Sequence, residues 1–179
     1  LAEHHLLSGI NLGLTGDAIH INASGGSGKG KSSLQKKVSQ FFTKRVMLNS
    51  LSPKAIQYKG DVEGLIMVVD DVNLKDEEKI ATLRGLTSNE EERALISYTV
   101  IDQEFVELEI KGKGCIWLSN VDVASDPQLA NRFQIDCVDE SEEQDANVFQ
   151  FRLKKFALKQ HEKLIESIFE KWKPITDIL

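Results

Sequence analysis

The chain has 179 residues, of which 41% are apolar and 28% are charged, and its formal net charge is −6. These values are ordinary for one globular domain with a sizeable core. No apolar run approaches the ~20 residues that span a bilayer, and no signal peptide is visible, so we expect a cytoplasmic protein without a membrane partner. The acidic balance argues against a broad nucleic-acid-binding surface, and any DNA contact must therefore be local.

The charges are distributed unevenly along the chain. Residues 1–60 contain eight Lys or Arg and only two Asp or Glu, whereas residues 61–109 contain four Lys or Arg and fourteen Asp or Glu. A basic segment at the start of an acidic chain suits an anionic ligand, and we expect such a ligand to bind within the first third.

The cysteines and histidines do not form a recognisable metal site. Cys115 and Cys137 each lie in an apolar run, which predicts buried and reduced thiols rather than a disulfide. His4 and His5 have no Cys or acidic partner at ligand spacing, and we expect them on the surface of an N-terminal helix.

The most specific motif is Gly25–Ser32, which fits the phosphate-binding pattern G-x-x-x-x-G-K-[ST]. Glycines lack a Cβ, so backbone N–H groups can approach phosphate oxygens closely. Lys31 is expected to reach the β- and γ-phosphates, and the Ser32 hydroxyl to bind Mg²⁺. The alternative is a flexible Gly/Ser linker. The residues predicted to bind nucleotide are Gly25, Gly26, Ser27, Gly28, Lys29, Gly30, Lys31, Ser32 and Ser33.

Periodic segments flank this loop on both sides. The apolar run 18–21 predicts a buried strand before it. A helix is predicted to follow and to end near Arg45, with one apolar face made by Leu34, Val38, Phe41 and Phe42. Residues 1–12 are expected to be helical and 46–48 to form a short strand. Ser52 and Pro53 predict the start of a short helix that reaches Tyr58.

Two carboxylates end the next apolar run, residues 65–71. Five consecutive apolar residues predict a buried parallel strand whose carboxyl end meets the ligand. We assign Asp70 to Mg²⁺ and Asp71 to the water that attacks the γ-phosphate. The alternative is an Asp-Asp turn that only ends the strand.

The middle of the chain predicts one helix, a hairpin and another buried strand. Asn73 is expected to cap a helix over 75–86. Residues 95–110 alternate apolar and polar side chains around a polar centre, which is typical of a β-hairpin. The apolar run 115–118 then ends in Ser119-Asn120. Asn120 beside the Asp70 strand would bind the attacking water or the γ-phosphate, and the alternative is an Asn that turns the chain.

The last third predicts a short helix, a strand and a helical end. Asp126-Pro127 opens a helix that ends near Arg132, and 133–138 is apolar enough for a strand. Ser141-x-x-Gln144 has the form of a helix-capping box, although 148–153 alternate as in a strand. An apolar stripe expected to pack in a core or against another subunit follows, made by Leu164, Ile165, Ile168, Phe169 and Trp172.

In this order the elements resemble the AAA+ ATPases. The likeness is greatest to the motor domains of replicative helicases in phage, plasmid and archaeal-virus replication proteins, which are related to the minichromosome-maintenance helicases. The matching segments are the loop through Ser32 (Walker A), 65–71 (Walker B), Ser119-Asn120 (sensor 1), and 129–133, which resembles the arginine-finger motif. Segments 51–56 and 138–141 also resemble the primase-helicase relatives.

The resemblance implies a three-layer α/β/α P-loop NTPase fold with a central parallel sheet, a β-hairpin insertion and a C-terminal helical segment. The ATPase core would comprise residues 1–140, and 141–179 would form a partial lid or a subunit-packing element. Because the sequence begins with Leu1, we expect a fragment of a longer replication protein that contacts other replication proteins.

The resemblance also implies that Arg132 completes the site of a neighbouring copy, in a homo-oligomer that is a hexameric ring. The hairpin would face the central channel, where Lys111 and Lys113 would contact DNA phosphates. Two residues depart from the family pattern. Asp71 stands where Glu is usual and Asn131 where Ser is usual, and Arg152 is a weak candidate for sensor 2.

Three functions are consistent with these residues. The first is Mg²⁺-dependent ATP hydrolysis coupled to the unwinding or translocation of DNA. The second is an ATP-dependent switch with slow turnover, such as a replication initiator or a helicase loader. The third is a monomeric small-molecule kinase, which would have no role for Arg132.

Overall fold

The structure is a computed structural model. It describes residues 1–48, 60–70, 74, 76–88, 95–101, 104–120, 126–157, 166–168 and 170–172. The predicted helix at 52–58, the predicted cap Asn73 and the predicted catalytic residue Asp71 lie outside the described residues. Among the described residues, no helix is both long and apolar enough to cross a membrane.

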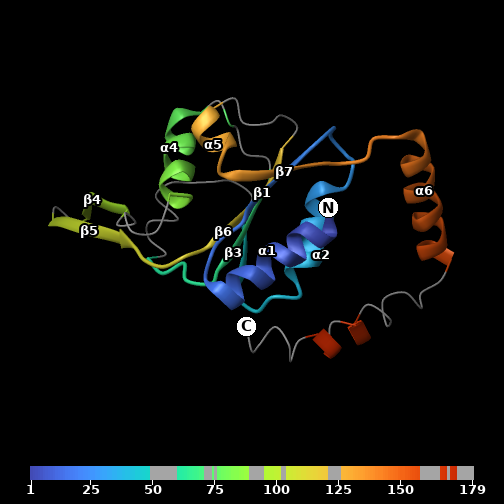
Figure 1. The fold of residues 1–179 in the computed structure, drawn as a ribbon, viewed down its shortest axis with the longest axis horizontal. Coiled ribbons are helices and arrows are strands. Elements are labelled where there is room, and N and C mark those ends of the chain that lie inside the picture. Colours follow the sequence, from blue (N-terminus) through green and yellow to red (C-terminus); the bar gives the residue numbers. More distant parts are fainter. Residues whose placement is uncertain are drawn as a thin grey trace.

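Five parallel strands form the central sheet (Figure 1). Their order across the sheet is β2-β3-β6-β1-β7, and every neighbouring pair is parallel. The strands are β1 (His20–Ser24), β2 (Arg45–Leu48), β3 (Ile66–Asp70), β6 (Cys115–Asn120) and β7 (Phe133–Cys137). The expected α/β P-loop fold with a parallel sheet is therefore confirmed.

Side chains of β3 and β6 alternate between two apolar layers, because successive residues of a strand point to opposite faces. Ile66 and Trp117 pack in the layer of α1 (Ala2–Thr15) and α2 (Lys31–Ser39). Met67 and Leu118 pack in the opposite layer, whose helices are α4 (Glu77–Leu86) and α5 (Pro127–Ala130). Covering the sheet on both faces explains why the central strands are apolar without interruption.

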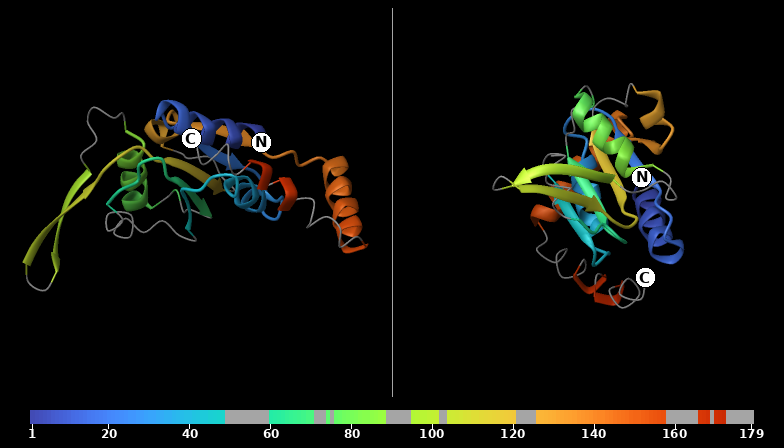
Figure 2. Two further views of the ribbon diagram at one scale, coloured as in Figure 1. Left: turned by 90° about the horizontal axis from the view of Figure 1, so that it is seen from below. Right: turned by 90° about the vertical axis from the view of Figure 1, so that its left-hand side faces the viewer.

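Two further elements project from opposite ends of this body (Figures 1 and 2). One is the antiparallel hairpin of β4 (Leu95–Ile101) and β5 (Glu104–Ile110), which confirms the predicted hairpin. The other is α6 (Glu142–Ala157), which follows β7. Ser141 Oγ accepts a hydrogen bond from the Gln144 N–H at 3.2 Å, so the predicted cap is confirmed and the strand considered at 148–153 is a helix.

Several boundaries differ from those predicted. β1 begins at His20 instead of Ala18, and α2 ends at Ser39 instead of near Arg45. The chain turns after Ser39 because Arg45 must start β2 beside Ile66 of β3. Asp76 caps α4, since its carboxylate accepts hydrogen bonds from the N–H groups of Glu78 and Lys79.

Two predictions about burial were wrong. His5 is fully buried because it lies on the inner side of α1, where its ring meets Trp117 edge to face at 4.8 Å. Cys137 is exposed because it ends β7, a strand at the edge of the sheet, whereas Cys115 is buried in β6 as expected. Of the predicted C-terminal stripe, Ile168 and Trp172 are described; both are partly exposed, and Trp172 contacts Phe41.

Candidate functional site

A cavity of about 420 Å³ lies at the carboxyl ends of β1, β3 and β6. Parallel strands bring the residues that follow them to one edge of the sheet, where α/β proteins bind ligands. The cavity joins the predicted phosphate loop to both predicted strand ends. Its lining residues are Ser27, Gly28, Lys29, Gly30, Lys31, Ser32, Ser33, Asp70, Ser119 and Asn120.

The phosphate loop has a conformation that depends on glycine. Gly28 and Gly30 have φ angles of 79° and 90°, which side-chain-bearing residues rarely adopt. Gly30 is the N-cap of α2, so the helix starts inside the loop and its first N–H groups have no partner within the helix. These groups and the positive end of the helix dipole favour an anion in the cavity.

Lys31 places a buried positive charge at this loop. Its side chain is 8% exposed, and its Nζ donates hydrogen bonds to the carbonyl oxygens of Gly25 at 2.5 Å and Gly26 at 2.7 Å. Carbonyl groups orient the ammonium but do not neutralise it. Among the described residues no carboxylate forms an ion pair with Lys31, and a buried charge without such a partner is unfavourable, so the position of Lys31 favours the binding of an anion.

Asp70 forms a compact cluster with two hydroxyl groups in the same cavity. Asp70 Oδ1 accepts hydrogen bonds from Ser32 Oγ at 2.5 Å and from Ser119 Oγ at 2.8 Å. The two hydroxyl oxygens lie 3.0 Å apart. A carboxylate and a hydroxyl are the hard oxygen donors that Mg²⁺ prefers, so Asp70 and Ser32 fit the predicted metal.

The pKa of Asp70 lies below its ordinary value of 3.8, which keeps the carboxylate ionised at neutral pH. Burial is the largest single influence, and it acts in the opposite direction by raising the pKa. The hydrogen bonds from Ser32 and Ser119, together with the positive charges of Lys36 and Lys31, outweigh it. The site therefore offers a cation a fully charged ligand.

Ser119, rather than Asn120, is the residue of β6 that meets Asp70. Asp70 and Ser119 are register partners in the parallel β3–β6 pair, which confirms the expected adjacency of the two strands. Side chains alternate along β6, so Asn120 points toward the α4 layer, although it still borders the cavity. The sequence showed two polar residues at this strand end, and only the register identified which one faces the carboxylate.

Arg132 lies at the other end of the sheet. It directly precedes β7, whose first residue Phe133 pairs with His20, whereas the phosphate loop follows the last residue of β1. Four residue steps of about 3.3 Å separate those two ends. Arg132 instead contacts α4, because its Nη1 donates a hydrogen bond to the carbonyl oxygen of Arg84. Arg132 therefore contributes nothing to the phosphate loop of its own chain.

An ion pair adjoins Arg132. The Arg84 guanidinium binds both carboxylate oxygens of Asp126, through Nε at 3.1 Å and through Nη2. Asp126 also accepts a hydrogen bond from the Leu129 N–H at 2.8 Å and so caps α5. The pKa of Asp126 is lowered, first by the Arg84 hydrogen bond and then by the Leu129 N–H. Arg84 and Asp126 therefore satisfy each other, whereas Arg132 binds a neutral carbonyl.

The two lysines predicted to contact DNA are each paired with a carboxylate. Lys111 Nζ lies 2.9 Å from Glu109 Oε2, and Lys113 Nζ lies 3.4 Å from Asp17 Oδ1. Both follow β5 at the base of the hairpin rather than at its tip. The described hairpin side chains nearest the tip include the exposed Glu104. Contact with DNA stays a prediction.

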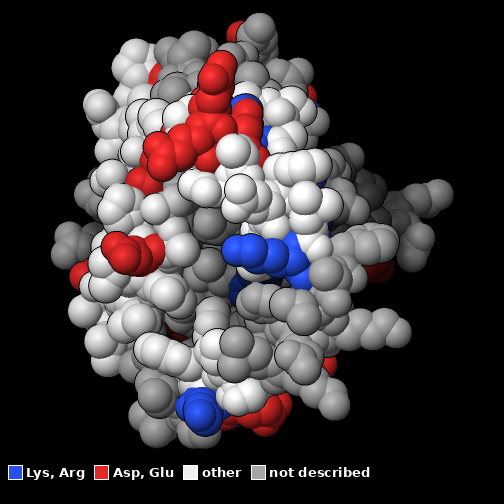
Figure 3. Space-filling model, turned by 90° about the vertical axis from the view of Figure 1, so that its right-hand side faces the viewer, with Lys and Arg blue, Asp and Glu red and all other residues white. Residues whose placement is uncertain are grey.

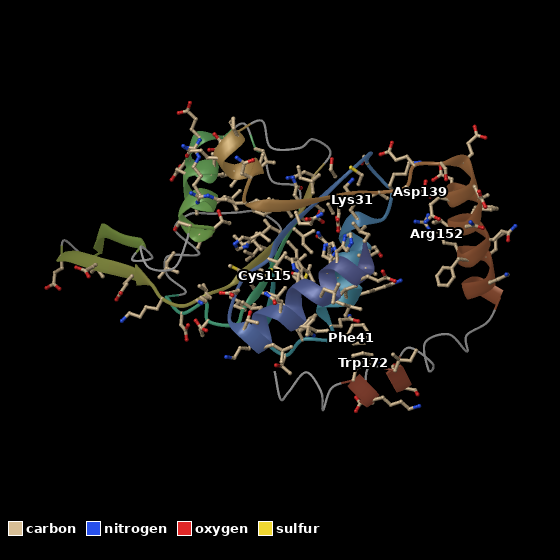
Figure 4. All side chains as sticks on the ribbon, viewed as in Figure 1. Lys31, Phe41, Cys115, Asp139, Arg152 and Trp172 are labelled. Atoms are coloured by element: carbon tan, nitrogen blue, oxygen red, sulfur yellow. The ribbon has the colours of Figure 1, made fainter. Side chains whose placement is uncertain are left out.

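Sequence reasoning singled out residues 138–141 by resemblance but did not predict that this connection from β7 to α6 contacts the phosphate loop. Glu140 Oε1 accepts a hydrogen bond from the Gly26 N–H, and the Asp145 carboxylate binds Lys29 Nζ at 2.8 and 2.9 Å. Figure 4 shows the start of α6, near Asp139, on the same side of the body as Lys31. No local signal marks this contact, since the partners are 114 and 116 residues apart.

Comparison with known protein families gives a match that covers nearly the whole chain. A family model described as the MTBMA_p00010 P-loop domain matches residues 2–177. No curated protein matches the chain.

Proposed function

The chain belongs to the MTBMA_p00010 P-loop domain family, and from this premise we propose that it binds and hydrolyses ATP with Mg²⁺. One observation carries the proposal. A buried ammonium, that of Lys31, and a carboxylate held by two hydroxyls, that of Asp70, line the same cavity at a glycine-rich helix start. Phosphoryl transfer needs positive charge on the phosphates and an oxygen-ligand site for the metal beside them.

Each residue of the cavity has a role in this proposal. The N–H groups of residues 25–33 bind the phosphate oxygens, and Lys31 compensates charge on the β- and γ-phosphates. Ser32 and Asp70 hold Mg²⁺, which when bound neutralises charge on the triphosphate. Ser119 is a positioning residue, because its hydrogen bond orients the Asp70 carboxylate and keeps it ionised. Asp71 and Asn120 orient the attacking water.

We extend the proposal to a homo-oligomer in which Arg132 acts on the nucleotide of a neighbouring copy. Arg132 is half-buried at the end of the sheet opposite its own loop, so only another chain's loop can come within its reach. An arginine acting in this way accelerates phosphoryl transfer by about 10³–10⁵-fold. In the ring that the AAA+ resemblance implies, the Arg84 carbonyl would hold the guanidinium until a neighbour docks.

DNA unwinding or translocation is the finer proposal. It is supported by the resemblance and by a hairpin that projects from the body, as a DNA-gripping element must (Figure 2). The ion pairs of Lys111 and Lys113 favour the slow ATP-dependent switch instead, because paired lysines have less positive charge to offer phosphates. A small-molecule kinase remains the third candidate.

A subunit-mixing experiment tests the proposal. We expect Lys31→Ala and Arg132→Ala proteins each to have little ATPase activity, and a mixture of the two to regain a measurable part of it. In the mixture an intact loop in one chain can meet an intact arginine from the other. If Arg132→Ala by itself is a monomer and hydrolyses ATP at the wild-type rate, that result would favour the kinase and refute the shared site.

Stimulation by DNA separates the motor from the switch. We expect a motor to hydrolyse ATP several-fold faster with single-stranded DNA, and a switch to turn over slowly at the same rate with or without it. The oligomeric state with a non-hydrolysable ATP analogue, measured by mass, then states how many copies assemble.

A further inference from the structure

The phosphate loop of this chain is already in contact with carboxylates of its own fold. Glu140 binds the N–H of Gly26, and Asp145 binds the ammonium of Lys29; we call this pair the acidic clasp. Glu140 Oε1 lies so close to the loop that a Cβ on Gly25 would approach it to 3.0 Å. Gly26 is also one of the two residues whose carbonyls orient Lys31. The clasp therefore engages the nucleotide-binding loop itself.

The charges of the clasp oppose a polyphosphate. Hydrogen bonding to Asp145 is the largest influence that raises the pKa of Lys29, and the charges of Asp145, Glu140 and Asp139 act in the same direction. A triphosphate would bring several further negative charges to the same loop. Like charges brought close together destabilise each other, and the partly exposed ammonium of Lys29 cannot fully compensate the charge of both the Asp145 carboxylate and the triphosphate. Figure 3 shows acidic side chains gathered on the upper part of this end of the molecule.

The described side chains of helix α6 are mostly exposed. From residue 142 to residue 154 every side chain is exposed except that of Gln144, which is half-buried. Phe149 and Leu153 are 64% and 54% exposed, so their apolar surface is not packed against the domain. An isolated helix of this length is marginally stable in water. Among the described residues, Glu140 just before the helix and Asp145 in its first turn join the start of α6 to the phosphate loop.

We propose that the acidic clasp is an internal competitor of the nucleotide and that nucleotide binding releases the start of α6. In the empty loop Glu140 and Asp145 occupy groups that the polyphosphate requires. Triphosphate binding displaces them. The free energy of the clasp contacts in the empty state therefore weakens triphosphate binding, and a chain without the clasp binds the triphosphate more tightly by the corresponding factor. Nucleotide occupancy thereby sets the position of α6 and of its exposed apolar side chains Phe149 and Leu153. This inference rests on the proposed binding of nucleotide at the loop.

The affinity of a non-hydrolysable ATP analogue with Mg²⁺ tests the competition. We expect Glu140→Gln to bind the analogue roughly three- to tenfold more tightly than wild type, since the amide oxygen can still accept the Gly26 N–H but the exposed hydrogen bond loses its charge assistance and the repulsion of the polyphosphate is removed. Asp145→Asn is expected to change affinity in the same direction by less. The matched control is Glu143→Gln, which removes one exposed charge from the same turn of α6 and should bind within about twofold of wild type.

Hydrogen exchange gives a second measurement that does not depend on turnover. We expect amides of residues 141–147 to exchange faster when the analogue binds wild type, and to exchange fast in Glu140→Gln even without it. Equal or weaker analogue binding by Glu140→Gln would overturn the clasp and indicate that Glu140 supports the loop. Exchange that is unchanged by the analogue would overturn the release of α6.

These outcomes separate the clasp from the function on which it rests. If wild type binds the analogue and Lys31→Ala does not, the nucleotide site stands, and the Glu140→Gln result alone decides the clasp. If wild type fails to bind the analogue, both proposals are wrong.

Discussion

The two ends of the parallel sheet use charged residues in opposite ways. At the carboxyl ends of the strands, Lys31 is buried against neutral carbonyls and Asp70 against hydroxyls, so neither charge meets its opposite directly. At the amino end of β7, Arg84 and Asp126 form a bidentate ion pair. In the cavity the charges of Lys31 and Asp70 are left for a ligand, whereas the Arg84–Asp126 pair supports α4 and α5. Each end has one exception: Lys29 is paired with Asp145 at the loop, and Arg132 at the opposite end binds a neutral carbonyl.

The largest expected effect comes from removing the uncompensated ammonium. Lys31→Ala should lower the steady-state rate of ATP hydrolysis by roughly 10²–10³-fold, comparable to the loss of a preorganised charge-stabilising donor. The measurement is phosphate release at saturating Mg²⁺ and ATP. Lys37→Ala, which removes an exposed lysine from the same helix, should keep the wild-type rate. A Lys31→Ala protein as active as this control would place the site elsewhere.

A pair of matched aspartate substitutions would separate the two ends. Asp70→Asn should reduce Mg²⁺-dependent hydrolysis by about 10²-fold or more, since the metal loses its charged ligand, and should leave the melting temperature nearly unchanged. Asp126→Asn should do the reverse and lower the melting temperature by a few degrees, because it breaks the Arg84 ion pair and weakens the cap of α5. If both variants lose stability and neither loses Mg²⁺-dependent hydrolysis, the distinction between the two ends of the sheet is wrong.

Ser119 sharpens the comparison within the site. Ser119→Ala should raise the Mg²⁺ concentration required for half-maximal activity several-fold, because Asp70 loses one of its two orienting hydroxyls. The substitution also removes an influence that lowers the pKa of Asp70. The carboxylate then protonates at a higher pH, so the acid limb of the activity profile should move upward.

The control for Ser119 is the variant that keeps the hydroxyl. Ser119→Thr should show both the wild-type Mg²⁺ requirement and the wild-type acid limb of the activity profile. If Ser119→Ala caused only a structural defect, it would change neither of these two quantities. Asn120→Ala is expected to leave the Mg²⁺ requirement unchanged and to lower the maximal rate if Asn120 orients the attacking water. An Mg²⁺ requirement that responds to Asn120 and not to Ser119 would contradict the observed register.

The smallest expected effect is on the free energy of unfolding and involves the buried His5 of α1. His5 Nε2 receives a hydrogen bond from Gln35 of α2, and burial is the main reason why its pKa lies below the ordinary value of 6.5. The unfolded chain therefore binds a proton at pH values where the folded chain does not. Stability should be highest above pH 6.5 and fall as the pH decreases below it. Thermal melts between pH 5 and pH 8 measure this.

The corresponding variant is His5→Gln, whose side chain does not titrate. Its melting temperature should change less between pH 7.5 and pH 5.5 than that of wild type, by a few degrees at most. His4→Gln is the comparison at the neighbouring position of α1; the His4 side chain is 53% exposed, but its Nδ1 lies 2.7 Å from Asp136 Oδ1, so this variant also removes that contact. Equal pH dependence of the wild type and His5→Gln would mean that another group titrates.

Local sequence patterns predicted much of this protein for a physical reason. Strand and helix periods, capping residues and the spacing of the phosphate loop depend on residues within a few positions of one another. They therefore identified the loop at Gly25, the Asp70 strand, the hairpin and the cap at Ser141. They erred at Cys137 and His5, whose burial depends on which strand lies at the sheet edge and which helix face turns inward.

Only the tertiary structure decided the contacts that give the site its chemistry. Asp70 and Ser119 are 49 residues apart and meet because β3 and β6 pair in one register, and a slip of one residue would have presented Asn120 to Asp70 instead. Glu140 reaches Gly26 across 114 residues because β7 pairs with β1 and delivers the chain to the loop. Such pairings arise from packing the whole sheet, and no window of neighbouring residues contains the information that specifies them.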